Sequence, residues 1–175
     1  MVIWLIGMSR AGKTVIGREV YNLLKAKQPN VVFLDGDIVR EIMGNDLGHT
    51  IEDRRKNAWR ICRLCKFLDS QGIDVVCSIL SIFPETQEWN RMNIPRYFQV
   101  YLRVPMEQLI ERDSRGLYLR ARTGEIKNVV GIDIEFPQPV GTDLTIDNDK
   151  PAGSFVEIAS EIVSSIPWEI NNHER

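Results

Sequence analysis

Eight consecutive residues near the N-terminus have the types and spacing needed to hold a phosphate group. Residues 7–14 read Gly-Met-Ser-Arg-Ala-Gly-Lys-Thr and match the pattern G-x-x-x-x-G-K-[ST]. The two glycines let the backbone bend so that consecutive N–H groups converge on a phosphate. Lys13 adds a positive charge, and Thr14 offers a hydroxyl to a magnesium ion. The pattern therefore predicts a site for the phosphates of a nucleotide.

An acidic sequence, Asp35-Gly36-Asp37, follows the second apolar run of the chain. A carboxylate in that place can face a bound hydroxyl across from the phosphate loop and accept its proton. The third apolar run ends at Cys77-Ser78 without a carboxylate. Asp35 and Asp37 are therefore expected to help place magnesium as well. Asp-Gly-Asp is also common in turns that have no catalytic role.

Several arginines follow these motifs and are candidates for holding anionic groups. Guanidinium groups bind phosphate and sulfate oxygens through paired N–H donors, although arginines are also common on solvated surfaces. The candidates are Arg40, Arg54 and Arg112. Arg10 lies inside the phosphate loop itself, where related loops commonly have glycine. Its side chain must either point away from the bound phosphates or reach for one of them.

Short apolar runs alternate with helical patterns along the chain. Strands are predicted at Val2–Ile6, Val31–Leu34, Ile73–Cys77, Tyr97–Val104 and Leu144–Ile146. Helices are predicted from the phosphate loop to about Lys27, over about Ile51–Gln71, after Pro105, and over Phe155–Ile166. This alternation predicts an α/β fold in which helices cover both faces of a parallel sheet. Ligands of such sheets bind at the carboxyl ends of the strands, where each motif above falls.

Residues from 114 to about 140 lack a regular apolar period and form a long connection. Such a segment is typical of a functional lid or of a disordered region. The length of 175 residues fits one domain, taken as residues 1–175. The net charge of −2 gives no reason to expect a nucleic-acid polymer or an anionic membrane as a partner.

The chain has no apolar run of the length that a membrane span needs, and a cytoplasmic protein with reduced thiols is expected. Cys62 and Cys65 recur at helical spacing with apolar neighbours and are therefore expected in the core. Zinc would need two more ligands, and the two histidines, His49 and His173, do not have the spacing of a zinc-finger pattern. A zinc site is not expected.

The chain resembles the adenylylsulfate kinase family, a group of P-loop kinases, over roughly residues 2–151. The segments that carry the resemblance occur in the family's order and at family-like spacing. They are the phosphate loop, Leu34–Asp37 with Val39 and Arg40, Asp46–Gly48, Glu52–Arg54, Asn57, Arg112-Asp113, Gly116–Tyr118, Ala121-Arg122, Gly124–Asn128 and Gly131–Asp133. The resemblance implies a three-layer P-loop NTPase fold with a five-stranded parallel sheet of order 2-3-1-4-5 and a lid. It also favours a homodimer.

The resemblance further implies transfer of the ATP γ-phosphate to the 3′-hydroxyl of adenylylsulfate, a step of sulfate activation, with magnesium as cofactor. The residues implied in catalysis are Lys13, Asp37 and Lys127. Those implied in ATP binding are Gly7, Ser9, Arg10, Ala11, Gly12, Lys13, Thr14 and Arg112. Those implied in acceptor binding are Asp35, Asp37, Arg40, His49, Arg54, Asn57, Ile79, Ser81, Lys127 and Val129, and those implied near magnesium, partly through water, are Thr14 and Asp37.

A phosphoserine is also implied at Ser81, although direct in-line transfer requires no covalent intermediate.

Departures from the family cluster on the acceptor side. His49 and Val129 stand where the family has two phenylalanines that bracket the adenine of the acceptor. Stacking on an aromatic ring contributes about 1–3 kcal/mol per base, so adenine binding is expected to weaken. An arginine of the family is missing from the segment Ser81–Pro84, and Ile38 replaces an asparagine.

Two alternatives to an adenylylsulfate kinase therefore stay open, one with another acceptor and one without catalysis. Some relatives phosphorylate cytidine diphosphoramidate in polysaccharide tailoring, and a smaller pyrimidine suits the altered pocket. The chain could also be a catalytically silent nucleotide-binding protein. Retention of Lys13, Thr14, Asp37 and Lys127 together argues against the silent protein.

Overall fold

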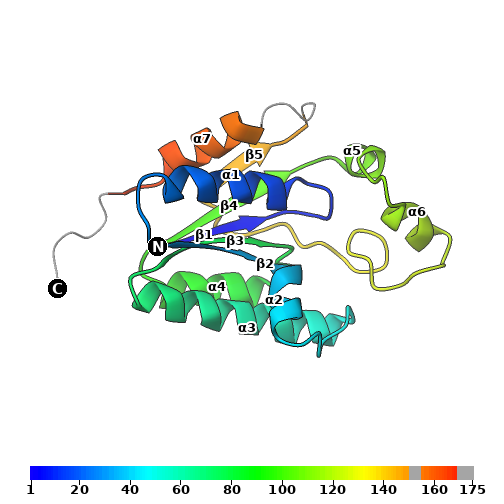
Figure 1. The fold of residues 1–175 in the computed structure, drawn as a ribbon. Coiled ribbons are helices and arrows are strands. Elements are labelled where there is room, and N and C mark those ends of the chain that lie inside the picture. The colour runs from blue at the N-terminus through cyan, green and yellow to red at the C-terminus, as the bar shows by residue number, and fades with distance from the viewer. Residues whose placement is uncertain (150–154, 169–175) are drawn as a thin grey trace.

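Five parallel strands form the centre of the computed structural model, which describes residues 1–149 and 155–168. The strands are β1 (Val2–Ile6), β2 (Val31–Asp35), β3 (Asp74–Ile79), β4 (Tyr97–Arg103) and β5 (Leu144–Asp147). Their order in the sheet is β2-β3-β1-β4-β5, as the resemblance implied. The central strand β1 pairs with β3 on one side and with β4 on the other (Figure 1).

Helices cover both faces of the sheet, which confirms the three-layer expectation (Figure 1). One face carries α1 (Lys13–Lys25) and α7 (Phe155–Ser165), and the other carries α2 (Gly36–Ile42), α3 (Ile51–Ser70) and α4 (Pro84–Asn93). Two short helices, α5 (Met106–Glu111) and α6 (Leu117–Arg122), lie beyond the carboxyl ends of the strands.

The alternation of side chains along β1 explains why both faces need a helix layer. All five residues of β1 are fully buried. Ile3 and Leu5 join the core under α1 and α7, whereas Val2, Trp4 and Ile6 join the core under α3. A continuous apolar strand of this kind is stable only where both faces exclude water. The sheet therefore holds β1 rigidly, and the phosphate loop begins where β1 ends.

Three features differ from the sequence prediction. The acidic sequence at 35–37 begins a helix, because the Asp35 side chain caps α2 by accepting a hydrogen bond from the Asp37 N–H at 3.0 Å. Helix α4 was not predicted, and it starts at Pro84, whose fixed φ suits a first helical turn. The expected lid at 114–140 contains the helix α6, which follows Gly116 in a left-handed conformation.

The thiols of α3, the possible metal ligands and the longest helices bear on the other expectations. Cys62 and Cys65 lie in the α3 core as free thiols. Within residues 1–149 and 155–168, no cluster of His, Cys, Asp or Glu side chains has the arrangement of a metal site. No helix in the same ranges is both long and apolar enough to cross a bilayer.

Gly17 provides a test of how closely α1 approaches the sheet. A Cβ added at Gly17 would lie 2.2 Å from Ser78 Oγ, and that hydroxyl is held by a 2.9 Å hydrogen bond to the Lys13 carbonyl. Gly17→Ala is therefore expected to lower the free energy of unfolding by about 1–3 kcal/mol despite the better helix propensity of alanine. Chemical denaturation measures this change.

The matched control is Val15→Ala on the same helix, at a side chain that is 47% exposed. Its free energy of unfolding is expected to stay close to that of the unchanged protein. Equal free energies of unfolding for Gly17→Ala and the control variant would contradict the close contact between α1 and β3.

Candidate active site

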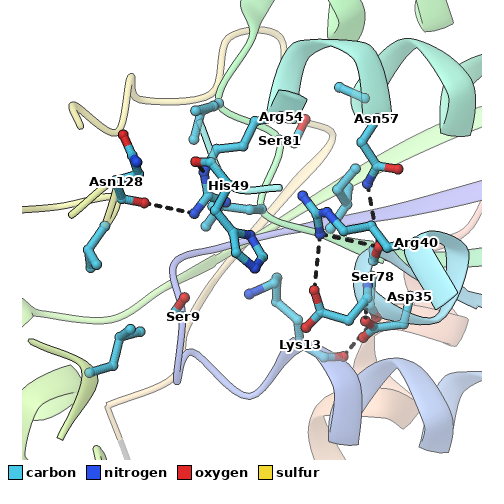
Figure 2. Close-up of a pocket in the computed structure, with 18 of the residues that line it drawn as sticks. Ser9, Lys13, Asp35, Arg40, His49, Arg54, Asn57, Ser78, Ser81 and Asn128 are labelled. Atoms are coloured by element: carbon cyan, nitrogen blue, oxygen red, sulfur yellow. Dashed lines mark hydrogen bonds and ion pairs between the residues drawn. The ribbon is translucent and has the colours of Figure 1, made fainter. Parts of the chain in front are cut away.

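A cavity of about 770 Å³ opens at the carboxyl ends of β1, β2 and β3. The phosphate loop, the start of α2, the first half of α3 and the expected lid contribute its walls (Figure 2). The predicted site residues that line it are Ser9, Arg10, Lys13, Thr14, Asp35, Asp37, Arg40, His49, Arg54, Asn57, Ile79, Ser81, Lys127 and Val129. One cavity thus brings together side chains that lie more than one hundred residues apart in the chain.

The phosphate loop has the bent backbone that its sequence predicts. Gly12 is left-handed with a φ of 87°, and the Ala11 N–H donates to the Met8 carbonyl at 3.1 Å. Gly7 lies so close to β4 that a Cβ there would be 3.0 Å from the Leu102 carbonyl oxygen. Helix α1 begins directly at Lys13. The backbone N–H groups at the start of α1 therefore open toward the cavity, as a phosphate site requires.

The Lys13 side chain is partly buried against this loop, and its ammonium group donates to the Met8 carbonyl at 2.8 Å. Burial lowers the pKa of Lys13 to about 8, although Asp35 and Asp37 act in the opposite direction. An anion bound beside Lys13 would favour the protonated form. The site is therefore electrostatically prepared for a phosphate.

Asp35 and Asp37 occupy different places in the cavity. Asp35 Oδ2 accepts a 2.7 Å hydrogen bond from Thr14 Oγ1, which joins β2 to the phosphate loop. Asp37 Oδ1 pairs with Arg40 Nη1 at 3.1 Å, and the Asp37 side chain is 86% exposed. Asp35 is thus the carboxylate beside the loop hydroxyl, whereas Asp37 projects into the open part of the cavity.

Arg40 from α2 and Arg54 from α3 add two positive charges to the lining of the cavity (Figure 2). Arg54 donates from Nε to the His49 carbonyl and from Nη2 to the Asn128 carbonyl, both at 2.9 Å. The pKa of Arg54 is lowered mainly by desolvation and to a smaller extent by the charge of Arg40. Two arginines that repel each other in a partly dehydrated cavity form a favourable site for an anion.

His49 and Asn57 belong to the same lining. Desolvation, and then the charges of Arg40 and Arg54, lower the pKa of His49, so its ring is neutral at neutral pH. Asn57 is 3% exposed and donates to the Gly36 carbonyl at 3.4 Å. Asn57 Oδ1 is buried without a hydrogen-bond partner among the residues that the structure describes.

The lid segment contributes an exposed Lys127 and a buried Val129. Val129 is 6% exposed because it packs in a cluster with Ala11, Leu109 and Tyr118. Its isopropyl group therefore offers little surface to a ligand, much less than a ring would at the same position.

Two aromatic rings belong to the described lining of the cavity, and only one of them is accessible. Phe83 is 4% exposed, and the guanidinium of Arg55 lies 4.4 Å from the centre of its ring. His49 is the other ring, and it is exposed. A base that enters this cavity can thus stack on the imidazole of His49.

Ser81 and Arg112 lie differently from the residues above. Ser81 is 3% exposed, and its Oγ accepts a 3.1 Å hydrogen bond from Trp4 Nε1. A buried hydroxyl with a fixed partner is poorly placed for phosphorylation. Arg112 caps the end of α5 and does not belong to the cavity lining. Its role in ATP binding, which the resemblance places near the adenine base, stays a prediction.

Sequence reasoning missed some residues of the cavity wall. Ser78 donates to the Lys13 carbonyl and so fixes the start of α1 against β3. Asn128 presents its carbonyl to Arg54 from a left-handed backbone with a φ of 64°. Lys127-Asn128 belongs to the segment 124–128 that carries the resemblance. The contact of Asn128 uses its main-chain oxygen, however, and any residue type could provide that oxygen. Arg115 and Arg120 also line the cavity from the lid.

Comparisons with known proteins agree with this geometry. A family model described as adenylylsulphate kinase matches residues 1–147. A Campylobacter jejuni protein described as cytidine diphosphoramidate kinase is 43% identical over 150 residues, which are 84% of this chain and 85% of that protein. An adenylyl-sulfate kinase of Halothermothrix orenii is 39% identical over 163 residues, which are 93% of this chain and 87% of that protein.

A solved structure extends the agreement to three dimensions. The Mycobacterium tuberculosis APS kinase CysC in complex with AMPPNP and APS superimposes with a TM-score of 0.84 at 30% identity, covering 94% of this chain and 95% of that chain. The phosphate loop, the shared sheet order and the family match over 147 residues lead to one conclusion. This chain is a phosphotransferase of the adenylylsulfate kinase family.

Proposed function

We propose that the protein transfers the γ-phosphate of ATP to a ribose hydroxyl of a small nucleotide whose phosphate carries a further group. The observation that supports this most directly is the placement of Lys13 and Thr14 in one cavity with Asp37, Arg40 and Arg54. The first pair suits the triphosphate, and the arginines suit the anionic part of the acceptor. Asp37 lies between these two regions and suits the hydroxyl that reacts.

The reaction is a single in-line displacement. The acceptor hydroxyl oxygen forms a bond to the γ-phosphorus, the bond to the oxygen that bridges the β- and γ-phosphates breaks, and Asp37 accepts the hydroxyl proton. Lys13 and the loop amides stabilise the negative charge on the phosphates. Thr14 would hold magnesium together with Asp35 and Asp37, partly through water, and the ion would neutralise phosphate charge when bound.

The base of the acceptor is the part that the cavity defines best. Because Val129 is buried and Phe83 is covered, His49 is the ring that remains for stacking. A single imidazole matches a pyrimidine better than a purine, since a purine loses more stacking area when an aromatic partner is absent. The 43% identity to the cytidine diphosphoramidate kinase supports the same choice. Our first candidate for the acceptor is therefore cytidine diphosphoramidate.

Adenylylsulfate is the second candidate. It is supported by the family match over residues 1–147 and by the 39% identity to the Halothermothrix orenii enzyme. Arg40 and Arg54 suit a phosphosulfate as well as a phosphoramidate, because both groups present oxygen acceptors. A role in sulfate activation would follow from this second acceptor.

An acceptor panel tests the proposal. Purified protein with ATP and magnesium is assayed for ADP release with cytidine diphosphoramidate, adenylylsulfate, CDP and AMP. Cytidine diphosphoramidate is expected to give the highest kcat/KM, by tenfold or more over adenylylsulfate, because about 1.4 kcal/mol of lost stacking corresponds to that ratio. A reversed ranking would assign adenylylsulfate as the acceptor. If no nucleotide in a wide set of acceptors supported ADP release, the protein would be a catalytically silent nucleotide-binding protein.

Replacement of Asp37 tests the proton acceptor. Asp37→Asn removes the base but keeps the shape of the side chain, so kcat is expected to fall by about 10²–10⁴ while the Kd for ATP changes little. The control is Glu41→Gln, which removes a carboxylate from an exposed position of the same helix. Its kcat is expected to stay within about twofold. Equal kcat values for the two variants would remove Asp37 from the mechanism.

The pKa of Lys13 predicts how ATP binding depends on pH. The pKa of about 8 belongs to the free protein, and bound phosphates must raise it because they favour the protonated amine. The affinity for ATP is therefore expected to be constant below pH 8 and to fall, by up to about tenfold per pH unit, above pH 8. Calorimetric titration between pH 7 and 9.5 measures this slope.

Lys13→Arg provides the control for that measurement, because a guanidinium stays charged over the whole range. The variant is expected to bind ATP more weakly at pH 7 but with no fall above pH 8. An affinity of the unchanged protein that is equally independent of pH would show that Lys13 is not the group that titrates.

A further inference from the structure

Arg10 holds an unusual place in the phosphate loop. It lies between the two loop glycines and has a φ of 68°, a left-handed conformation that non-glycine residues rarely adopt. Its side chain is 29% exposed and lines the same cavity as Ser9, Lys13 and Thr14. The left-handed backbone at Arg10 is energetically unfavourable, and it places a long cationic side chain beside the phosphate site.

A buried carboxylate fixes the direction of this side chain. Arg10 Nε donates to Asp113 Oδ1 at 3.1 Å, and the Asp113 side chain is only 2% exposed. The second oxygen, Asp113 Oδ2, accepts the Tyr118 N–H at 2.8 Å. Both carboxylate oxygens are therefore occupied, and Asp113 is held in one orientation between α5 and α6.

The contact with Asp113 uses one edge of the guanidinium. Among residues 1–149 and 155–168, the structure shows no hydrogen bond from the two terminal nitrogens of Arg10. These nitrogens are not among the buried polar atoms that lack a partner, so they face accessible space. An arginine held at Nε by a buried carboxylate keeps its terminal N–H groups free for a phosphate.

We propose that Arg10 is a catalytic residue whose terminal nitrogens bind the γ-phosphate, and that Asp113 is the positioning residue that directs them there. This inference rests on the proposed phosphoryl transfer. Lys13 and Arg10 then provide two loop cations, of which Arg10 carries the forked donors that suit phosphate oxygens. An arginine on the transferred phosphoryl group stabilises charge that spreads over its oxygens in the transition state.

A purely structural role is the rival explanation, because the Arg10–Asp113 pair also connects the loop to α6. A second connection makes the two roles separable. Tyr118 Oη donates to the Ser9 carbonyl at 2.8 Å, so it joins the neighbouring loop residue to α6 without contributing a charge. Tyr118→Phe therefore loosens the same connection while leaving the Arg10 guanidinium in place.

The test compares binding of ATP and ADP, each with magnesium, by calorimetric titration. Arg10→Gly is expected to weaken ATP about tenfold or more and to change the Kd for ADP less than threefold, because only ATP has the γ-phosphate. Arg10→Lys is expected to recover part of the ATP affinity, since it restores a charge without the forked donors. Tyr118→Phe is expected to leave the ratio of the two Kd values unchanged, even if it lowers the melting temperature.

Turnover completes the test, measured with whichever acceptor the unchanged protein phosphorylates. Arg10→Gly is expected to lower kcat by at least a hundredfold, and Asp113→Asn by a smaller factor, since Arg10 is still present but less well directed. An equal loss of ATP and ADP affinity in Arg10→Gly, or a matching effect of Tyr118→Phe, would overturn the catalytic role and leave the kinase proposal intact. Failure of the unchanged protein to bind either nucleotide would instead refute the kinase proposal, and this inference with it.

Discussion

Close backbone packing between the phosphate loop and the sheet is the constraint on which the site depends. Gly7 approaches the Leu102 carbonyl of β4, and Gly17 brings α1 against Ser78 of β3. Because side chains are absent at these two points, α1 can start directly above the ends of the central strands. The Ser78 hydroxyl then fixes the Lys13 carbonyl, and with it the first turn of α1. The loop amides and the Lys13 ammonium group are thereby oriented before any ligand binds, which limits the reorganisation that binding requires.

Charge is distributed in two regions around this rigid loop. Lys13, Asp35 and Thr14 form the first region, proposed for the triphosphate, where the Asp35 carboxylate accepts a 2.7 Å hydrogen bond from the Thr14 hydroxyl. Arg40 and Arg54 form the second region, proposed for the acceptor, and desolvation followed by the charge of Arg40 lowers the pKa of Arg54. Asp37 lies between the regions and pairs with Arg40. An acceptor anion that binds the arginines would compete for that pair and so leave the Asp37 carboxylate for a hydroxyl.

The sheet and the phosphate loop were predictable from the sequence because their signals are local. A buried strand such as Val2–Ile6 is a continuous apolar run, and the loop has fixed residue types at fixed spacing. The helical start at Asp35 was harder to predict, since an aspartate before a glycine suits a turn as well as a helix cap. The direction of Arg10 depends on Asp113, about one hundred residues away, and no local pattern contains that contact. The sequence indicated that arginines would line the cavity. It did not indicate which rings a ligand can reach, because the burial of Phe83 and Val129 depends on tertiary packing.

The central claim is that the loop amides hold the triphosphate with its γ-phosphorus toward Asp37. A crystal structure with magnesium, a non-hydrolysable ATP analogue and the acceptor tests it most directly. The account predicts loop N–H groups within about 2.7–3.2 Å of the β-phosphate oxygens. It also predicts that the acceptor hydroxyl oxygen lies about 3–3.5 Å from the γ-phosphorus and in contact with Asp37. Phosphates bound away from residues 7–14, or a hydroxyl on the far side of the cavity from Asp37, would contradict it.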